Sequence, residues 1–263
     1  MANYLNIAND NGKLIISDTL NIMQPVRSIK GVINSFTANS VDSTYGPRAF
    51  APYTGVSTET LNSIHADYEK ALMAYRIVGD VGDLPYGRVY LSEYDYEKNI
   101  FKLGCNSFGN TPIEVQTAFL AYNGLNKPFG KCGMLAFNEQ EKLIFDASLG
   151  TVHHLGSIYT KLNVGSDGDK NYLIKDLTGL GLDPARIFIS LRATPYVSFV
   201  EYRDGGNQYR SGWRTWMPRY RVTDNKLFLD LKRWVPKNYT GYYDSEYQPI
   251  FAASLYYLPN IRL

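Results

Sequence analysis

The chain has 263 residues, of which 44% are hydrophobic and 20% are charged, as in an ordinary folded protein and unlike a disordered one. No run approaches the ~18 apolar residues of a membrane-spanning helix, and the opening residues lack a signal-peptide pattern, so we expect a soluble cytoplasmic product. The two cysteines, Cys105 and Cys132, match no metal-binding or redox spacing and are expected to be free thiols. The net charge is only +2, although the second half is the more basic.

The first predicted element is a β-hairpin. The apolar residues Leu5 and Ile7 on one side, and Leu14 and Ile16 on the other, flank a short polar turn at 9–12. Asn11 and Gly12 in that turn tolerate the positive φ angles of a tight hairpin connection. A third strand is expected near 22–33.

A loop region and the one clear helical pattern of the chain follow. Residues 34–56 are rich in Ser, Thr, Gly, Pro and Tyr. Beyond Ser57 and Thr58, which can cap a helix, apolar residues recur at three- and four-residue steps. This pattern predicts a short helix near 58–70, and an apolar strand is expected next at 71–78.

The hairpin pattern then occurs a second time. An offset of 129 residues aligns 12–20 with 141–149 and carries Ser28 onto Ser157. The second turn has the same length but no glycine, so it is expected to differ in type. A third strand of this second copy is expected near 151–162.

Similarity returns toward the end of each half. The apolar strands at 71–78 and 186–193 carry Arg76 and Arg192 at matching places. Further along, Asn99-Ile-Phe-Lys-Leu resembles the segment that begins at Asn225, and Ala118-Phe-Leu-Ala-Tyr resembles the segment that begins at Ala252. The two halves therefore share their openings and their ends, and differ in the middle.

The size of the repeat predicts the domain organisation. A period of 129 residues is too long for a solenoid unit and matches one domain. Short strands separated by turns predict an all-β, mainly antiparallel fold, and parallel βαβ units are not expected because helical patterns do not alternate with the strands. We therefore predict two tandem related β-sandwich domains, at 1–122 and 132–263, joined by a linker at 123–131.

No motif of the chain predicts an enzyme. The sequence contains neither a Gly-x-Ser-x-Gly elbow nor a phosphate-binding glycine loop. His153 and His154 are adjacent on a predicted strand, so they point to opposite faces and cannot readily share a metal. Asp167 and Asp169 have the opening spacing of a calcium loop, but its closing residues are missing. We expect no catalytic, cofactor-binding or metal-binding residues.

The strongest candidate for a contact surface is the aromatic and basic tract at 209–221. Exposed Trp and Arg side chains supply many hot spots of protein interfaces, and aromatic faces also stack on sugars. The alternative is that Trp213 and Trp216 fill the core of the second sandwich, and the sequence leaves both interpretations open. The candidate interface residues are Tyr209, Arg210, Trp213, Arg214, Trp216, Arg219 and Tyr220.

The first half opens with the pattern Leu5-x-Ile7-x-Asn9-x-x-Gly12-x-Leu14-Ile15-Ile16-Ser-Asp18. In the second half, Met134-Leu-Ala-Phe-Asn138 with Leu143-Ile-Phe-Asp146-Ala-Ser148 resembles this pattern but lacks the glycine. This opening resembles that of small β-rich proteins from tailed bacteriophages and prophages, over roughly the first 30 residues of each half. In those proteins an apolar strand, Asn-x-x-Gly and a Leu-Ile-Phe-Asp-Ser-like strand open a tail-associated domain. The resemblance implies a virion tail, tail-tip or fibre-proximal component and supplies no catalytic residues.

These features together favour a non-enzymatic structural protein of a phage particle, assembled in the host cytoplasm and retained in the virion. The expected partners are other virion tail proteins, with the chain itself in a homo-oligomeric ring or trimer. No membrane span and no cofactor are expected. Two alternatives stay open: an adhesin that binds a host-surface glycan, and a capsid decoration protein. Contact with nucleic acid through the basic segment 203–237 is the less favoured partner choice.

Overall fold

The structure is a computed structural model in which every strand pairing of the described residues is antiparallel. It describes residues 6–8, 14–17, 23–33, 50–52, 72–79, 86–95, 100–107, 113–122, 135–137, 143–163, 168–193, 196–202, 209–234 and 248–261. Among them the one helical element is a single 3-10 turn, η4, at Pro184–Arg186. The prediction of a mainly antiparallel β fold is confirmed, whereas the predicted helix at 58–70 and the linker at 123–131 lie outside the described residues.

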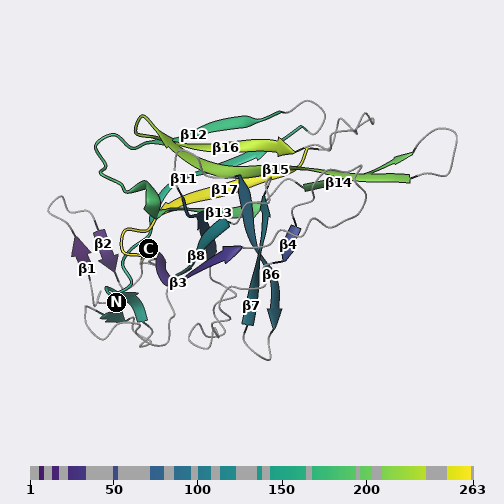
Figure 1. The fold of residues 1–263 in the computed structure, drawn as a ribbon. Coiled ribbons are helices and arrows are strands. Elements are labelled where there is room, and N and C mark those ends of the chain that lie inside the picture. Colours follow the sequence, from purple (N-terminus) through teal and green to yellow (C-terminus); the bar gives the residue numbers. More distant parts are fainter. Residues whose placement is uncertain are drawn as a thin grey trace.

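The strands fall into two series along the chain (Figure 1). The first series is β1 (Asn6–Ala8), β2 (Leu14–Ser17), β3 (Met23–Ile33), β4 (Phe50–Pro52), β5 (Leu72–Ile77), β6 (Gly87–Asp95), β7 (Ile100–Ser107) and β8 (Ile113–Tyr122). The second series is β9 (Leu135–Phe137), β10 (Leu143–Asp146), β11 (His153–Lys161), β12 (Lys170–Asp176), β13 (Ile187–Ala193), β14 (Tyr196–Tyr202), β15 (Tyr209–Thr223), β16 (Lys226–Trp234) and β17 (Ile250–Tyr257).

The two predicted hairpins are confirmed. β1 pairs with β2, and β9 pairs with β10, each as a separate two-stranded sheet. The bounds of β1 and β2 coincide with those of β9 and β10 when the offset of 129 read from the sequence is applied. The third strand expected after each hairpin is also confirmed, as β3 and β11. Local alternation and turn chemistry were therefore sufficient to locate these elements.

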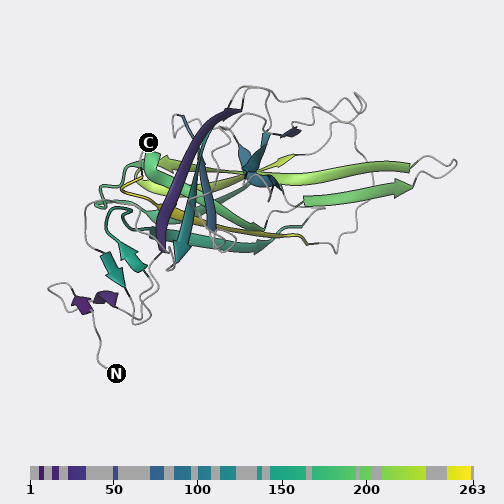
Figure 2. The same cartoon turned by 90° about the horizontal axis from the view of Figure 1, so that it is seen from below.

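Six strands from both halves form one continuous sheet, in the order β11-β17-β13-β5-β8-β3. The halves meet where β13 pairs with β5, with Ile189 opposite Tyr75. The order is the same when read from either end: the strand after the hairpin lies at the edge, the last strand of the half lies next to it, and the apolar middle strand lies at the centre. Figure 2 shows the strand direction turning strongly between the two ends of this sheet, as the right-handed twist of strands requires.

A β-bulge interrupts both edge strands at matching places. In β3 the register with β8 shifts between Pro25 and Arg27, so one extra residue stands at position 26. In β11 the register with β17 shifts between His154 and Gly156, so the extra residue stands at position 155. The two bulges are 129 positions apart, as are the two hairpins. Bulges are specific local departures from regular pairing. The backbone of the two halves therefore departs from regular pairing at positions that the sequence offset of 129 also matches.

The remaining strands form a four-stranded sheet, in the order β12-β16-β15-β14, and a three-stranded sheet, in the order β4-β7-β6. β15 and β16 are joined by the two-residue turn Asp224-Asn225, in which both residues have positive φ angles of 50° and 55°. Such a turn matches the twist of the strands it connects, and Asn and Asp tolerate this conformation better than other residues with side chains.

The main hydrophobic core lies between the six-stranded and the four-stranded sheets, and both halves contribute to it. Its buried members are Tyr75, Ile77, Ile113, Val115 and Phe119 from the first half and Leu155, Leu162, Leu177, Ile187, Ile189, Trp216, Tyr220, Leu227, Leu229, Leu231, Phe251, Ala253 and Leu255 from the second. Burial of these side chains is the dominant stabilising term, at about 1.5–3 kcal/mol for each large aliphatic or aromatic residue. The core is therefore shared by the two predicted domains.

A buried glutamine also joins the halves. Gln24 in β3 donates through Nε2 to the carbonyl oxygens of Asp146 and Gly150, at 2.8 Å each. Its Oε1 accepts from the backbone N–H of Asp146 at 2.9 Å. One side chain thus satisfies three backbone groups in the turn that follows β10, which would be costly to leave unpaired in this buried position.

Candidate functional site

The predicted tract at 209–221 lies in β15, between β14 and β16. Two of its residues belong to the core. Trp216 is fully buried and its indole Nε1–H donates to the carbonyl oxygen of Gly168 at 3.1 Å. Tyr220 is also buried, and its hydroxyl donates to the carbonyl oxygen of Pro184 at 3.4 Å. Trp216 therefore lies in the core, which is one of the two alternatives that the sequence left open.

The N-terminal part of the tract is described by its backbone. Its four candidate residues pair with β14 as Tyr209 with Tyr202, Arg210 with Glu201, Trp213 with Ser198 and Arg214 with Val197. Their side chains lie outside the described part of the structure. Whether they form an interface stays a prediction.

Burial has a chemical consequence for Tyr220. Desolvation of the phenol raises its pKa to about 12, and the nearby Arg76 guanidinium opposes this shift without cancelling it. Tyr220 is therefore neutral at all ordinary pH values and acts as a buried packing residue.

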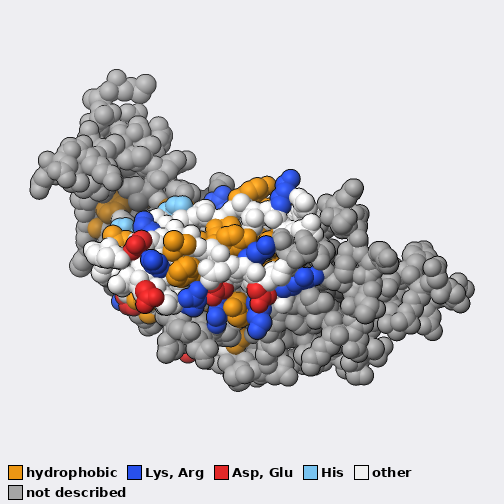
Figure 3. All heavy atoms as spheres, turned by 90° about the horizontal axis from the view of Figure 1, so that it is seen from above, with side chains coloured by type: hydrophobic (Ala, Val, Ile, Leu, Met, Phe, Trp, Pro, Cys, Tyr) orange, Lys and Arg blue, Asp and Glu red, His pale blue; other side chains and the backbone are white. Residues whose placement is uncertain are grey.

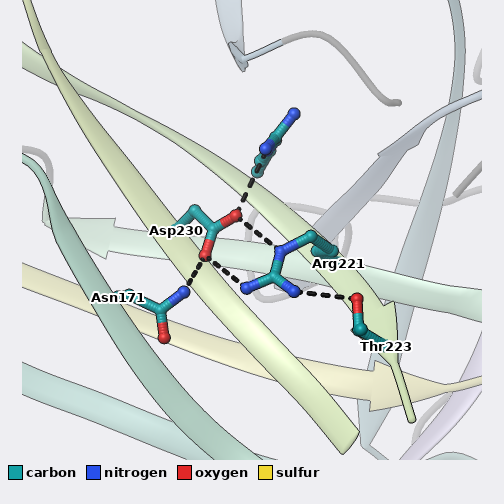
Figure 4. A network of polar contacts seen from close by, with 5 residues as sticks. Asn171, Arg221, Thr223 and Asp230 are labelled. Carbon is teal, nitrogen blue, oxygen red and sulfur yellow. Dashed lines mark hydrogen bonds and ion pairs between the residues drawn. The ribbon is translucent and has the colours of Figure 1, made fainter. Parts of the chain in front are cut away.

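Arg219, the remaining candidate, belongs to a network around Asp230 on the outer face of the four-stranded sheet (Figure 4). The Asp230 carboxylate accepts from Arg219 Nε at 3.3 Å and from Arg221 Nε at 3.1 Å. Its other oxygen accepts from Asn171 Nδ2 at 2.5 Å. Arg221 also donates to Thr223 Oγ1 at 2.8 Å. One carboxylate thus crosslinks three adjacent strands and occupies both arginines.

An aromatic residue of the first half extends this network. The guanidinium of Arg219 lies 4.3 Å from the ring centroid of Tyr86, and the ammonium of Lys232 lies 5.5 Å from the same ring. Both distances are within the range of a cation–π contact. Burial raises the pKa of Tyr86, while the charge of Arg219 acts in the opposite direction. The outer face shown in Figure 3 therefore has acidic and basic side chains side by side, and its described arginines are engaged within the chain.

A second candidate site lies on the other face of the six-stranded sheet, above β11, β17 and β13. It is a hollow of about 550 Å³, within the range of about 300–1,000 Å³ typical of small-ligand sites. Its lining residues are Met23, Val152, His154, Ser157, Ile158, Tyr159, Arg192, Ala252, Ala253, Ser254 and Tyr256. None of them was a candidate interface residue in the sequence, and His154 was considered there only as a metal ligand.

Side-chain size explains the hollow. β17, which lies between β11 and β13, contributes three small buried residues to the lining, Ala252, Ala253 and Ser254; the side chain of Ala253 also belongs to the main core. The flanking strands contribute long side chains at its rim, Tyr159 from β11 and Arg192 from β13. Tyr159 is 71% exposed, the largest value among the exposed apolar and aromatic side chains of the described residues.

A chain of polar contacts runs along one wall of the hollow. His154 Nε2 lies 2.8 Å from Ser157 Oγ, and Ser157 Oγ lies 2.8 Å from Ser254 Oγ. The His154 ring also lies against Tyr256, with 5.5 Å between the ring centroids. These groups both donate and accept hydrogen bonds, because hydroxyl protons rotate and the imidazole has two tautomers.

The metal hypotheses weighed in the sequence find no support in the described residues. His153 pairs with Tyr257 and His154 with Tyr256, so the two imidazoles lie on opposite faces of β11 as predicted. The side chain of Asp169 accepts a hydrogen bond from the backbone N–H of Arg233, and Asp167 lies outside the described residues. No group of three or more His, Cys, Asp or Glu residues in the described part is placed to hold a metal ion.

Comparison with known proteins returned no match, either among protein-family models or among curated proteins and solved structures. In the parts of the chain that the structure describes, no helix has the length and apolar character needed to cross a membrane.

Proposed function

We propose that the chain is a fused pseudo-dimer made of two tandem copies of one β-sandwich domain, at 1–122 and 132–263, with a linker at 123–131. The single observation that supports this proposal is the order of the six-stranded sheet, which is the same from both ends and carries its bulges 129 positions apart. The outer sheets fit the same scheme, because β4-β7-β6 and β12-β16-β15 follow one order, and β14 has no counterpart among the described strands of the first copy.

We further propose that this pseudo-dimer is a non-enzymatic structural protein of a phage virion, located in the tail near its tip or fibres. The repeated opening pattern supports the tail assignment by resemblance. The geometry supports a docking role, because one chain with two related domains can join assemblies of different symmetry. Three chains in a ring present three-fold symmetry through the whole chain and six-fold symmetry through the single domains.

The test is the number of copies in purified particles. Quantitative mass spectrometry of virions should find this chain at a multiple of three copies, and light scattering of the isolated protein should find a trimer or a larger ring. Labelling with a specific antibody should mark the tail under the electron microscope. Absence from the particle, or a copy number that is not a multiple of three, would contradict the proposal, and labelling of the capsid would favour a decoration protein.

A further inference from the structure

Arg76 and Arg192 occupy equivalent positions in the two halves and have opposite environments. Arg76 is 5% exposed, donates from Nε to Gln116 Oε1 at 2.9 Å and lies over the ring of Phe188. Arg192 is exposed, and it makes no hydrogen bond, ion pair or ring contact within the described structure. A free guanidinium in a hollow is available to a ligand, whereas the equivalent guanidinium is occupied by the fold.

A difference in the backbone accompanies this difference. β5 pairs with β8 in regular register from Leu72 to Ile77. β13 pairs with β17 with a shift between Leu191 and Ala193, so Arg192 is the extra residue of a bulge. Bulges are frequent next to functional sites because they redirect one side chain while interrupting the strand pairing only locally. The bulge at Arg192 belongs to the second half alone among these equivalent described strands.

The residues beside Arg192 are also more polar than the equivalent residues of the first half. In the first half Ser28 pairs with Ala118, which pairs with Ala74. The equivalent row in the second half is Ser157, Ser254 and Ser190, one from each of the strands β11, β17 and β13. Two alanines are therefore replaced by serines on the face that carries the hollow.

The charge of the hollow selects an anion. Arg192 is the permanent cation among its described lining residues, none of which is an aspartate or a glutamate. A guanidinium presents paired N–H donors that match the two oxygens of a carboxylate. Hydroxyl and imidazole groups along the wall suit a ligand with hydroxyl groups, and the exposed ring of Tyr159 offers an apolar face.

We propose that this hollow binds the carboxylate-bearing sugar residue of an acidic glycan. Arg192 binds the carboxylate, the ring of Tyr159 packs against the apolar face of the sugar, and His154 with Ser157 hydrogen-bonds its hydroxyl groups. This site is separate from the tract at 209–221, and it does not depend on a location in the virion.

The test uses the full chain and saturation-transfer NMR with free sugars at millimolar concentration. Glucuronic acid and N-acetylneuraminic acid should receive saturation, and glucose and N-acetylglucosamine should receive much less. Arg192→Gln should weaken binding of the acidic sugars at least tenfold, and Tyr159→Ala should weaken it severalfold. The matched control is Lys30→Gln, which removes an exposed cation in the first half. That cation is already paired with Glu114 at 2.7 Å, so binding should be unchanged.

Three results would overturn this proposal. The first is no saturation of any acidic sugar. The second is binding that Arg192→Gln leaves intact. The third is competition by inorganic phosphate or acetate as effective as that by the acidic sugars, which would mean that the hollow binds a small anion without recognising a sugar. Far-UV circular dichroism of each variant checks that the fold is retained.

Discussion

Replacing Asp230 with asparagine should destabilise the chain far more than the loss of an ordinary ion pair. The Asp230 side chain is only 8% exposed, and the two arginines that it binds are 22% and 24% exposed. Asparagine keeps the shape and one acceptor oxygen but removes the negative charge, so two adjacent guanidinium groups lose their counter-ion. Breaking a fully buried ion pair costs about 3–5 kcal/mol. Because both guanidiniums keep partial contact with water, we expect a loss of about 2–3 kcal/mol.

Urea unfolding followed by tryptophan fluorescence measures this loss, and the chain offers a matched control. The exposed pair Lys30–Glu114 has side chains that are 47% and 34% exposed. Glu114→Gln should therefore cost less than about 1 kcal/mol, as is usual for surface ion pairs. Equal losses for the two variants would refute the idea that the Asp230 network holds the outer sheet together, as would a gain in stability for Asp230→Asn.

Three further predictions concern the core and its sharing between the halves. Because burial raises the pKa of Tyr220 to about 12 from 10.0, the folded chain keeps a phenol proton that the unfolded chain loses. Stability in urea should therefore fall by about 2 kcal/mol as the pH rises from 10 to 12, and Tyr220→Phe should lack this component. Gly156→Ala should lower the free energy of unfolding by about 1–3 kcal/mol, because the added Cβ would lie 2.8 Å from Ile174 Cγ2. Gly168→Ala is the control: its added Cβ meets no atom within 4 Å, so thermal melting should show almost no change in stability. All three tryptophans lie in the second half, so fluorescence follows unfolding of that half, whereas far-UV circular dichroism follows unfolding of the whole chain. The two signals should give the same unfolding midpoint if the core is shared, and different midpoints if each half folds alone.

The sequence located the local elements and not their long-range pairing. The hairpins and the strands after them follow from alternation and turn residues, which act over a few positions. The pairing of β13 with β5 depends on edges that meet only after each half has folded, and no residue at Tyr75 or Ile189 signals it. The sequence therefore predicted two sandwiches side by side, and gave no indication that their inner sheets would be continuous.

The candidate site was harder to predict for a physical reason. Aromatic and basic residues in a strand serve equally as core, as ion-pair partners or as an exposed surface, and Trp216, Tyr220 and Arg219 fill the first two roles. The hollow left only a weak indication in the sequence. It consists of a small-residue run, Ala252-Ala253-Ser254, inside an apolar strand, together with an arginine that matched Arg76. Only the register of the sheet shows that these lie together.

If the chain is the proposed pseudo-dimer, the different environments of Arg76 and Arg192 give a physical reason for joining two copies in one chain. In a symmetric homodimer, the same patch lies on both subunits, so both arginines would have to be buried or both free. A fused chain removes that constraint, because each position can change independently within the same backbone frame. One guanidinium is fixed by Gln116 inside the fold, and the other has no partner among the described residues and lies beside a hydroxyl row. Fusion therefore permits one half to retain the scaffold while the other acquires a site.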